Sequence, residues 1–220
     1  MLKLGIDDAG RGPVIGPMVL AGVLIDEATE DLLKREGVKD SKQLTQKRRE
    51  FLENLIKEKA ETFEIVVVYP DEIDEKTAKN QLNDLEAIAC AKIINKINKG
   101  YNKIKVLVDC PSVSIAKWQD SLKLKIENLS NLDISCEHKA DQNHVSVSAA
   151  SILAKCVREK EMAILREKYG REIGSGYTSD PLTQRFIERY SQKYKDDGIF
   201  RKSWVTWKQA QADVEQKKLF

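Results

Sequence analysis

Runs of apolar residues dominate the first part of this 220-residue chain and predict buried strands. The run Met18–Ile25 is apolar at nearly every position, which is typical of a strand covered on both faces of its sheet. Glu64–Tyr69 is rich in β-branched residues and stops at Pro70, which cannot donate to a strand ladder. By the same reasoning, we expect further strands at Leu4–Asp7, Ile104–Val108 and Leu132–Cys136.

Helical spacing replaces these runs in the remaining segments. Residues 82–98 place apolar side chains three or four positions apart, which predicts an amphipathic helix. Residues 45–60 show the same spacing and begin with Thr45, a residue type that caps helix N-termini well. Further helices are expected at residues 113–128, 146–168, 181–194 and 203–217.

The order of these segments favours an α/β fold with a mixed sheet and a helical C-terminal region. Strands gather early, β-α-β units follow, and helices fill the last third. The first two strands are too close in sequence for an intervening helix, so we expect them to pair antiparallel. We expect residues 1–170 to form the core and residues 171–220 to form a helical extension of the same compact unit.

Composition is that of a globular protein, and charge limits its partners. Hydrophobic residues make up 41% of the chain, and a net charge of +2 excludes a uniformly basic, histone-like binder. Residues 139–220 hold 16 Lys or Arg against 11 Asp or Glu, whereas residues 1–138 hold 21 against 24. This asymmetry favours the C-terminal third as a face for a polyanion, although on charge alone solvated helix faces are the simpler interpretation.

The four cysteines lie far apart and form no C-x-x-C motif, which argues against a zinc knuckle or a thioredoxin-like site. We expect them to be buried, reduced thiols. No apolar stretch approaches the length of about 18 residues needed to cross a membrane, and the N-terminus lacks the features of a signal peptide. The chain is therefore predicted to be cytoplasmic.

Four aspartates follow expected strands. Asp7 and Asp8 end the first strand, Asp109 ends another, and Asp141 precedes a long helix. Sites in α/β sheets form outside the carboxyl ends of strands, and Mg²⁺ prefers carboxylate oxygens. Four carboxylates at one edge could hold two ions, an arrangement suited to phosphodiester displacement. The alternative is structural, because aspartate commonly ends strands and caps helices.

A glycine turn, Gly10-Arg11-Gly12-Pro13, follows the first two of these acids. Glycine allows a backbone to approach a ligand closely, and the amides of such a turn could contact phosphate or sugar oxygens. A simple tight turn is the commoner explanation. The segment is not a Walker A loop, because no Gly-Lys-Ser/Thr follows.

Six segments, taken in order and spacing, identify a family. They resemble the motifs of type 2 ribonucleases H (ribonuclease HII) in an archaeal form, and are Gly5–Pro17, Lys39–Thr45, Val108–Val113, Glu137–Asp141, Ser146–Lys155 and Gly174–Pro181. The resemblance implies a ribonuclease H-like core, with a five-stranded mixed sheet flanked by helices, and a C-terminal helical subdomain. It also implies an endoribonuclease that uses Mg²⁺ or Mn²⁺ to cut RNA–DNA hybrids and single ribonucleotides in duplex DNA, leaving 3′-hydroxyl and 5′-phosphate ends.

The resemblance also implies roles for individual residues. By motif match, the catalytic metal ligands would be Asp7, Asp8, Asp109 and Asp141. Gly10, Arg11 and Gly12 would read the ribose 2′-hydroxyl, and Tyr177 would pack on the sugar at the RNA–DNA junction. Positions near the phosphate backbone would be Ser41, Lys42, Asn83, Ser148, Ser151 and Lys155.

Some positions depart from the family pattern. The family usually has glutamate where this chain has Asp8, and an aromatic residue and proline where it has His144-Val145. The shorter carboxylate leaves an alternative open, namely a hybrid-binding protein with little or no nuclease activity. The end of the chain, residues 216–220, faintly resembles sliding-clamp-binding tails, although a frayed helix end is the simpler interpretation. Nothing in the sequence suggests an obligate oligomer, so we expect a monomer.

Overall fold

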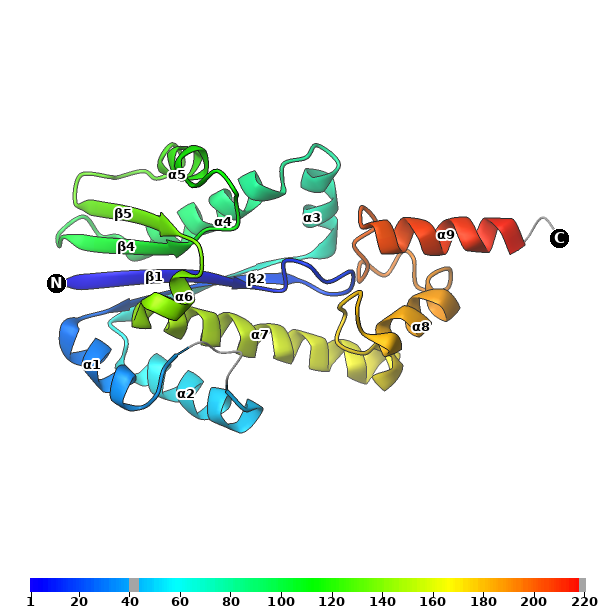
Figure 1. The fold of residues 1–220 in the computed structure, drawn as a ribbon, viewed down its shortest axis with the longest axis horizontal. Coiled ribbons are helices and arrows are strands. Elements are labelled where there is room, and N and C mark those ends of the chain that lie inside the picture. The colour runs from blue at the N-terminus through cyan, green and yellow to red at the C-terminus, as the bar shows by residue number, and fades with distance from the viewer. Residues whose placement is uncertain (40–43, 218–220) are drawn as a thin grey trace. The chain divides into compact units, whose positions relative to one another are not determined.

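The computed structural model describes residues 1–39 and 44–217, and for residues 213–217 it describes the backbone alone. One mixed sheet of five strands has the order β3-β2-β1-β4-β5 (Figure 1). As expected, β1 pairs antiparallel with β2, whereas β1 with β4 and β4 with β5 are parallel. The strands are β1 Leu2–Ala9, β2 Met18–Ile25, β3 Thr62–Val68, β4 Ile104–Asp109 and β5 Leu132–Glu137. The predicted α/β fold is thereby confirmed.

Helices occupy most of the remaining described chain. Three short ones, α1, α3 and α6, were not predicted by apolar spacing, because four to nine residues show too few turns for a clear period. The Asp26 side chain caps α1 and Pro70 begins α3, so local capping stabilises both. The α-helices are α1 Glu27–Arg35, α2 Gln46–Lys59, α3 Pro70–Thr77, α4 Leu82–Ile97, α5 Ile115–Lys123, α6 Ala140–Asn143, α7 Val145–Tyr169, α8 Pro181–Tyr190 and α9 Val205–Lys217.

Contacts divide the chain into two compact units, each assembled from separate segments. Unit 1 comprises Met1–Ala9, Val19–Val66 and Asn83–Val157, and unit 2 comprises Gly10–Met18, Val67–Leu82 and Arg158–Phe220. The expected division into residues 1–170 and 171–220 stays a prediction. Within unit 1, α1 and α2 cover one face of the sheet and α4 and α5 cover the other (Figure 1). This arrangement buries β2 along its whole length and most of β1 and β4, whereas the outer strands β3 and β5 are mostly half-buried.

Unit 2 has an apolar core of its own. It centres on Phe186, Phe200 and Trp207, and the Phe200 and Trp207 rings lie 4.6 Å apart between centroids. Val14 and Ile15, from the segment that follows the glycine turn, belong to the same core. The segment that follows the glycine turn therefore packs into a core formed mainly by the C-terminal part of the chain.

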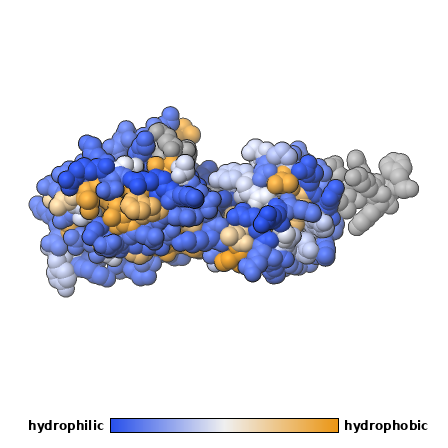
Figure 2. Space-filling view, turned by 90° about the horizontal axis from the view of Figure 1, so that it is seen from below, coloured by the Kyte–Doolittle hydropathy of each residue, from blue (hydrophilic) through white to orange (hydrophobic). Residues whose placement is uncertain are grey.

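The face of the molecule shown in Figure 2 is mainly hydrophilic, with apolar residues exposed only in limited areas. All four cysteines are buried and free, as expected. Within the two described ranges, no helix is both long and apolar enough to cross a membrane.

Candidate active site

The pairing of β1 with β4 brings two of the predicted acids to the same sheet edge. Ile6 pairs with Val108 in parallel register, so Asp7 and Asp109 come next on neighbouring strands. Asp7 is only 6% exposed. Its Oδ1 accepts a hydrogen bond of 2.8 Å from the Asp8 backbone amide. The two acids therefore follow strands that are adjacent and parallel.

Three of the four predicted acids line one small pocket in unit 1. Asp7, Asp8 and Asp109 share it with Glu86, a buried residue of α4 that sequence reasoning missed. Glu86 follows ordinary helical spacing and has no motif around it, so no local signal marked it. Apolar groups, including Val108 and Trp118, form the rest of the wall. Such walls lower the local dielectric and strengthen the interactions between charges.

The pocket is electrostatically unfavourable without a cation. Burial raises the pKa of Asp7 well above its usual value, and the nearby Asp8 and Asp109 carboxylates raise it further. A hydrogen bond from the Ser151 side chain acts in the opposite direction and favours the charged form. Burial, and then the Glu86 and Asp8 carboxylates, likewise raise the pKa of the Cys90 thiol well above its usual value. Negative charge is concentrated here, which is the condition that a bound divalent cation relieves.

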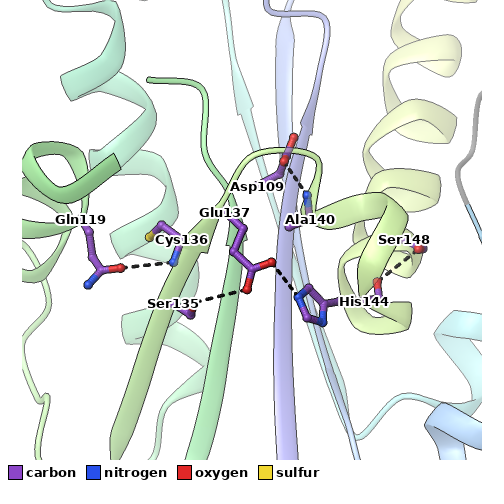
Figure 3. A network of polar contacts seen from close by, with 8 residues as sticks. All are labelled: Asp109, Gln119, Ser135, Cys136, Glu137, Ala140, His144 and Ser148. Carbon is purple, nitrogen blue, oxygen red and sulfur yellow. Dashed lines mark hydrogen bonds and ion pairs between the residues drawn. The ribbon is translucent and has the colours of Figure 1, made fainter. Parts of the chain in front are cut away.

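The backbone links Asp141 to the acids of the pocket. It lies on α6, is 5% exposed, and does not line the pocket. The preceding residue, Ala140, donates its backbone N–H to Asp109 Oδ1 at 2.9 Å, which ties α6 to the end of β4 (Figure 3). Among the described side chains, those of residues 1–39 and 44–212, no three acidic, histidine or cysteine groups are arranged to enclose an ion. The hard oxygen donors nevertheless fit Mg²⁺ or Mn²⁺, which need few protein ligands and retain water.

Polar contacts stabilise α6, the short helix that carries Asp141. His144 Nε2 lies 3.1 Å from Glu137 Oε2, so this contact links the end of β5 to the residue that follows α6 (Figure 3). On its other side, the Ser148 hydroxyl donates to the Asp141 carbonyl at 2.5 Å. His144 stands where the family usually has an aromatic residue, and here it forms a polar brace.

The residues that were predicted to lie near the phosphate backbone differ in their burial. Ser148 and Ser151 are buried and bond to protein groups, as described above. Lys155 is partly exposed on α7, and Asn83 is exposed at the start of α4, where its carbonyl accepts a bond of 3.0 Å from the Trp118 indole. Ser41 and Lys42 lie outside the described residues.

The start of α7 lies against β1 because β1 has a glycine there. A Cβ on Gly5 would lie 2.1 Å from the Ser146 backbone, so any other residue would push the helix away. This close approach brings Ser151, one and a half turns further along α7, within reach of Asp7.

The glycine turn lies in unit 2 and is held by two arginines. Gly10 has φ +83°, and a Cβ there would lie 2.3 Å from Arg158 Nε, so conformation and space both require glycine. Arg201, in the Arg201-Lys202-Ser203-Trp204 segment, donates to the carbonyls of Gly10 and Arg11. No local pattern in the sequence indicates the contact of this segment with a turn about 190 residues earlier.

Tyr177 is in the same unit and also contacts Arg158. Tyr177 is 42% exposed, and the Arg158 guanidinium carbon lies 4.9 Å from the centroid of its ring. Arg158 Nη2 also donates to the Ser175 carbonyl at 3.1 Å. Thus one arginine lies against the glycine turn and against the loop of Tyr177, and cation–π attraction helps to orient the tyrosine ring.

Comparison with known proteins agrees with the motifs. The protein-family model Ribonuclease HII matches residues 4–207. The chain is 42% identical over 218 residues to Ribonuclease HII of Methanococcus maripaludis strain C6, which covers 99% of this chain and 90% of that protein. It is 40% identical over 229 residues to Ribonuclease HII of Methanocaldococcus jannaschii, with 100% and 99% covered.

Solved structures extend the similarity to the fold. The ribonuclease H2 from Pyrococcus horikoshii OT3 matches with a TM-score of 0.87 and 37% identity, covering 98% of this chain and 99% of that one. The RNase HII of a PCNA:RNase HII complex from Archaeoglobus fulgidus matches with a TM-score of 0.81 and 37% identity, with 93% and 95% covered. Bst-RNase HIII, solved in complex with Mn²⁺, is 21% identical with a TM-score of 0.78, covering 98% of this chain and 71% of that one, and shows the fold alone.

Proposed function

Since this chain belongs to the ribonuclease HII family of metal-dependent endoribonucleases, we propose that it cuts at single ribonucleotides in duplex DNA as well as in RNA–DNA hybrids. The observation that carries the proposal is the buried carboxylate pocket of Asp7, Asp8 and Asp109, at the sheet edge where strands β1 and β4 end. The products would carry 3′-hydroxyl and 5′-phosphate ends.

Two divalent cations would be held by Asp7, Asp8, Asp109 and Asp141. When bound, Mg²⁺ or Mn²⁺ supplies an activated water and stabilises the charge that develops on the phosphate. The protein's part is to align the carboxylates and to offset part of the effect of burial on Asp7. The Ser151 hydroxyl favours the charged form of Asp7, and the Ala140 amide fixes one oxygen of Asp109.

Ribose recognition would come from unit 2. The 2′-hydroxyl distinguishes RNA from DNA at a single nucleotide, and backbone amides of the Gly10-Arg11-Gly12 turn can hydrogen-bond to it. Tyr177, partly exposed and oriented by Arg158, offers a flat apolar surface to the neighbouring sugar. Lys155, together with Lys42 from outside the described residues, would contact phosphates and position the duplex without reading its sequence.

The test is cleavage mapping on a DNA duplex that carries one ribonucleotide, with Mg²⁺ and Mn²⁺ compared. An all-DNA duplex of the same sequence and an RNA–DNA hybrid serve as matched substrates. We expect a single cut beside the ribonucleotide, no cut in the all-DNA duplex, and the end groups given above. Cleavage of the hybrid without cleavage of the single-ribonucleotide duplex would contradict the proposal.

The second candidate function is hybrid binding with weak or no cleavage. It is favoured by Asp8, whose carboxylate is one methylene shorter than the usual glutamate. A displacement of about 1 Å at a reacting group can cost on the order of 10²-fold in rate. Robust metal-dependent turnover in the mapping experiment would eliminate this candidate.

A sliding clamp is the proposed protein partner. The support is the similar RNase HII from Archaeoglobus fulgidus, which was solved in a PCNA:RNase HII complex, together with the C-terminal tail of this chain. The last three residues lie outside the described part. Deleting Leu219 and Phe220 should weaken binding to an archaeal clamp, while replacing Lys218 with alanine should leave it nearly unchanged. Equal clamp affinity of the deletion variant and the parent would show that this tail is not the tether.

A further inference from the structure

Arg201 is a fully buried cation whose hydrogen bonds converge on one turn. Its Nη2 donates to the Gly10 carbonyl at 2.6 Å, and its Nη1 donates to the Arg11 carbonyl at 2.7 Å. Nε and Nη2 also donate to the Gly16 carbonyl, at 3.1 and 2.9 Å. The planar guanidinium thus binds three carbonyl groups of unit 2 and fixes their directions.

Trp204 completes this set of contacts. Its indole Nε1 donates to the Gly12 carbonyl at 2.9 Å, and its ring lies against the Arg201 guanidinium, with 5.1 Å between the guanidinium carbon and the ring centroid. The carbonyls of three consecutive residues, Gly10, Arg11 and Gly12, therefore accept bonds from side chains of one four-residue segment.

Fixing these carbonyls also fixes the amides of the turn. In a planar trans peptide, the C=O of one residue and the N–H of the next point in opposite directions, and the described chain has no cis bond. Because the Gly10 and Arg11 carbonyls face Arg201, the amides of Arg11 and Gly12 face away from it. Gly12 is exposed, with no atom within 4 Å of where a Cβ would be, so the turn is accessible at Gly12.

The supporting segment is itself anchored at both ends. The Arg201 amide donates to the Val14 carbonyl at 2.8 Å, next to the β-bridge between Ile15 and Phe200. After it, Asp74 of α3 accepts the backbone amides of Lys202 at 2.6 Å and Ser203 at 2.9 Å. The direction of the turn amides is therefore set by packed structure before any substrate arrives.

From these contacts we infer that Arg201 and Trp204 are positioning residues for ribose selectivity, an inference that rests on the function proposed above. They do not touch the nucleotide. They hold the Arg11 and Gly12 amides in the direction needed to donate to a 2′-hydroxyl. Lysine at position 201 keeps the charge but has no planar fork, so it cannot hold the three carbonyls together.

The test measures binding preference in an Asp109→Asn background, which keeps the duplex intact. Affinities are compared for a DNA duplex with one ribonucleotide and for the all-DNA duplex, in the presence of Mg²⁺. We expect Arg201→Lys and Trp204→Phe to lower the ribose-to-deoxyribose affinity ratio about tenfold and a few-fold, as expected for misaligned hydrogen bonds. Affinity for the all-DNA duplex should stay unchanged, which a purely structural defect would not allow. Arg189→Lys, on the exposed surface of α8, is the matched control.

The outcomes separate the two proposals. If the Asp109→Asn parent itself shows no ribose preference, the proposed ribonucleotide recognition fails. If the parent shows the preference and both variants keep it with native thermal stability, the positioning role is overturned. Should Arg201→Lys fail to fold, Trp204→Phe decides, because it retains an aromatic ring and removes only the bond to Gly12.

Discussion

The carboxylate pocket of unit 1 concentrates negative charge, whereas the glycine turn of unit 2 surrounds a buried positive charge with carbonyl oxygens. In the pocket, Asp7, Asp8 and Asp109 lie close together, and the Asp8 and Asp109 carboxylates add to the burial that raises the pKa of Asp7. In the turn, a buried cation is matched to the carbonyls of Gly10 and Arg11. Under the proposed function, a bound metal ion completes the pocket, whereas the protein's own side chains complete the turn.

This difference predicts opposite responses to mutation. Removing one charge from the pocket relieves repulsion in the metal-free protein and removes a ligand, so stability and activity change in opposite directions. Removing a contact from the turn lowers both stability and activity, because the hydrogen bonds that position the amides also hold the segment in place. The predictions below test this contrast.

The largest effect is expected for Asp7→Asn, which keeps the shape of the side chain and removes its charge. Cleavage should fall on the order of 10³-fold, because the amide cannot replace a charged ligand in a two-metal site. Hybrid binding should stay close to that of the parent, as measured by fluorescence anisotropy. Cleavage at the parent rate would refute the metal-site assignment.

A smaller loss is expected at Tyr177. Replacement by alanine removes the surface for the sugar and the partner of Arg158, and should lower kcat/KM on the single-ribonucleotide duplex about 10- to 100-fold. Replacement by phenylalanine should cost much less, because the ring and its stacking remain. Equal losses in steady-state assays of the two variants would show that the hydroxyl, not the ring, carries the contact.

Asp8→Glu tests whether the pocket is tuned to the shorter acid. A longer carboxylate restores the usual family residue, and we expect a several-fold gain in kcat with Mg²⁺. Metal affinity, followed by isothermal titration with Mn²⁺, should rise in parallel. An unchanged rate would mean that the surrounding groups, such as Glu86 in the same pocket, already compensate.

The smallest effect concerns pH and the metal-free protein. Because the pKa of Asp7 is raised in the fold, its contribution to stability is fully present below the pKa of the unfolded chain and is lost as pH rises through the folded value. Thermal melts in EDTA should therefore show a loss of stability with rising pH. Asp7→Asn should reduce this slope, and saturating Mg²⁺ should also reduce it. An identical slope in the variant would exclude Asp7 as its source.

The pattern of apolar residues determined the strands and the antiparallel start of the sheet, whereas the parallel pairing that brings Asp7 and Asp109 to one edge came from the structure. The strands and the antiparallel start depend on local spacing and on connection length, which a single sequence displays directly. Family motifs marked Asp141 and Tyr177 in the same way, because their neighbours in sequence are distinctive. The confirmed fold and family show how far such local information extends.

Only the tertiary structure disclosed Glu86 in the pocket, Ser151 as a donor to Asp7, and Arg158 and Arg201 at the glycine turn. Arg201 and Gly10 are 191 residues apart, and no periodicity links them. A hydrogen bond between distant segments depends on how packed cores bring the chain together, which no local pattern encodes. The sequence by itself thus indicated which residues we propose to carry the chemistry, and the fold decided which residues hold them in position.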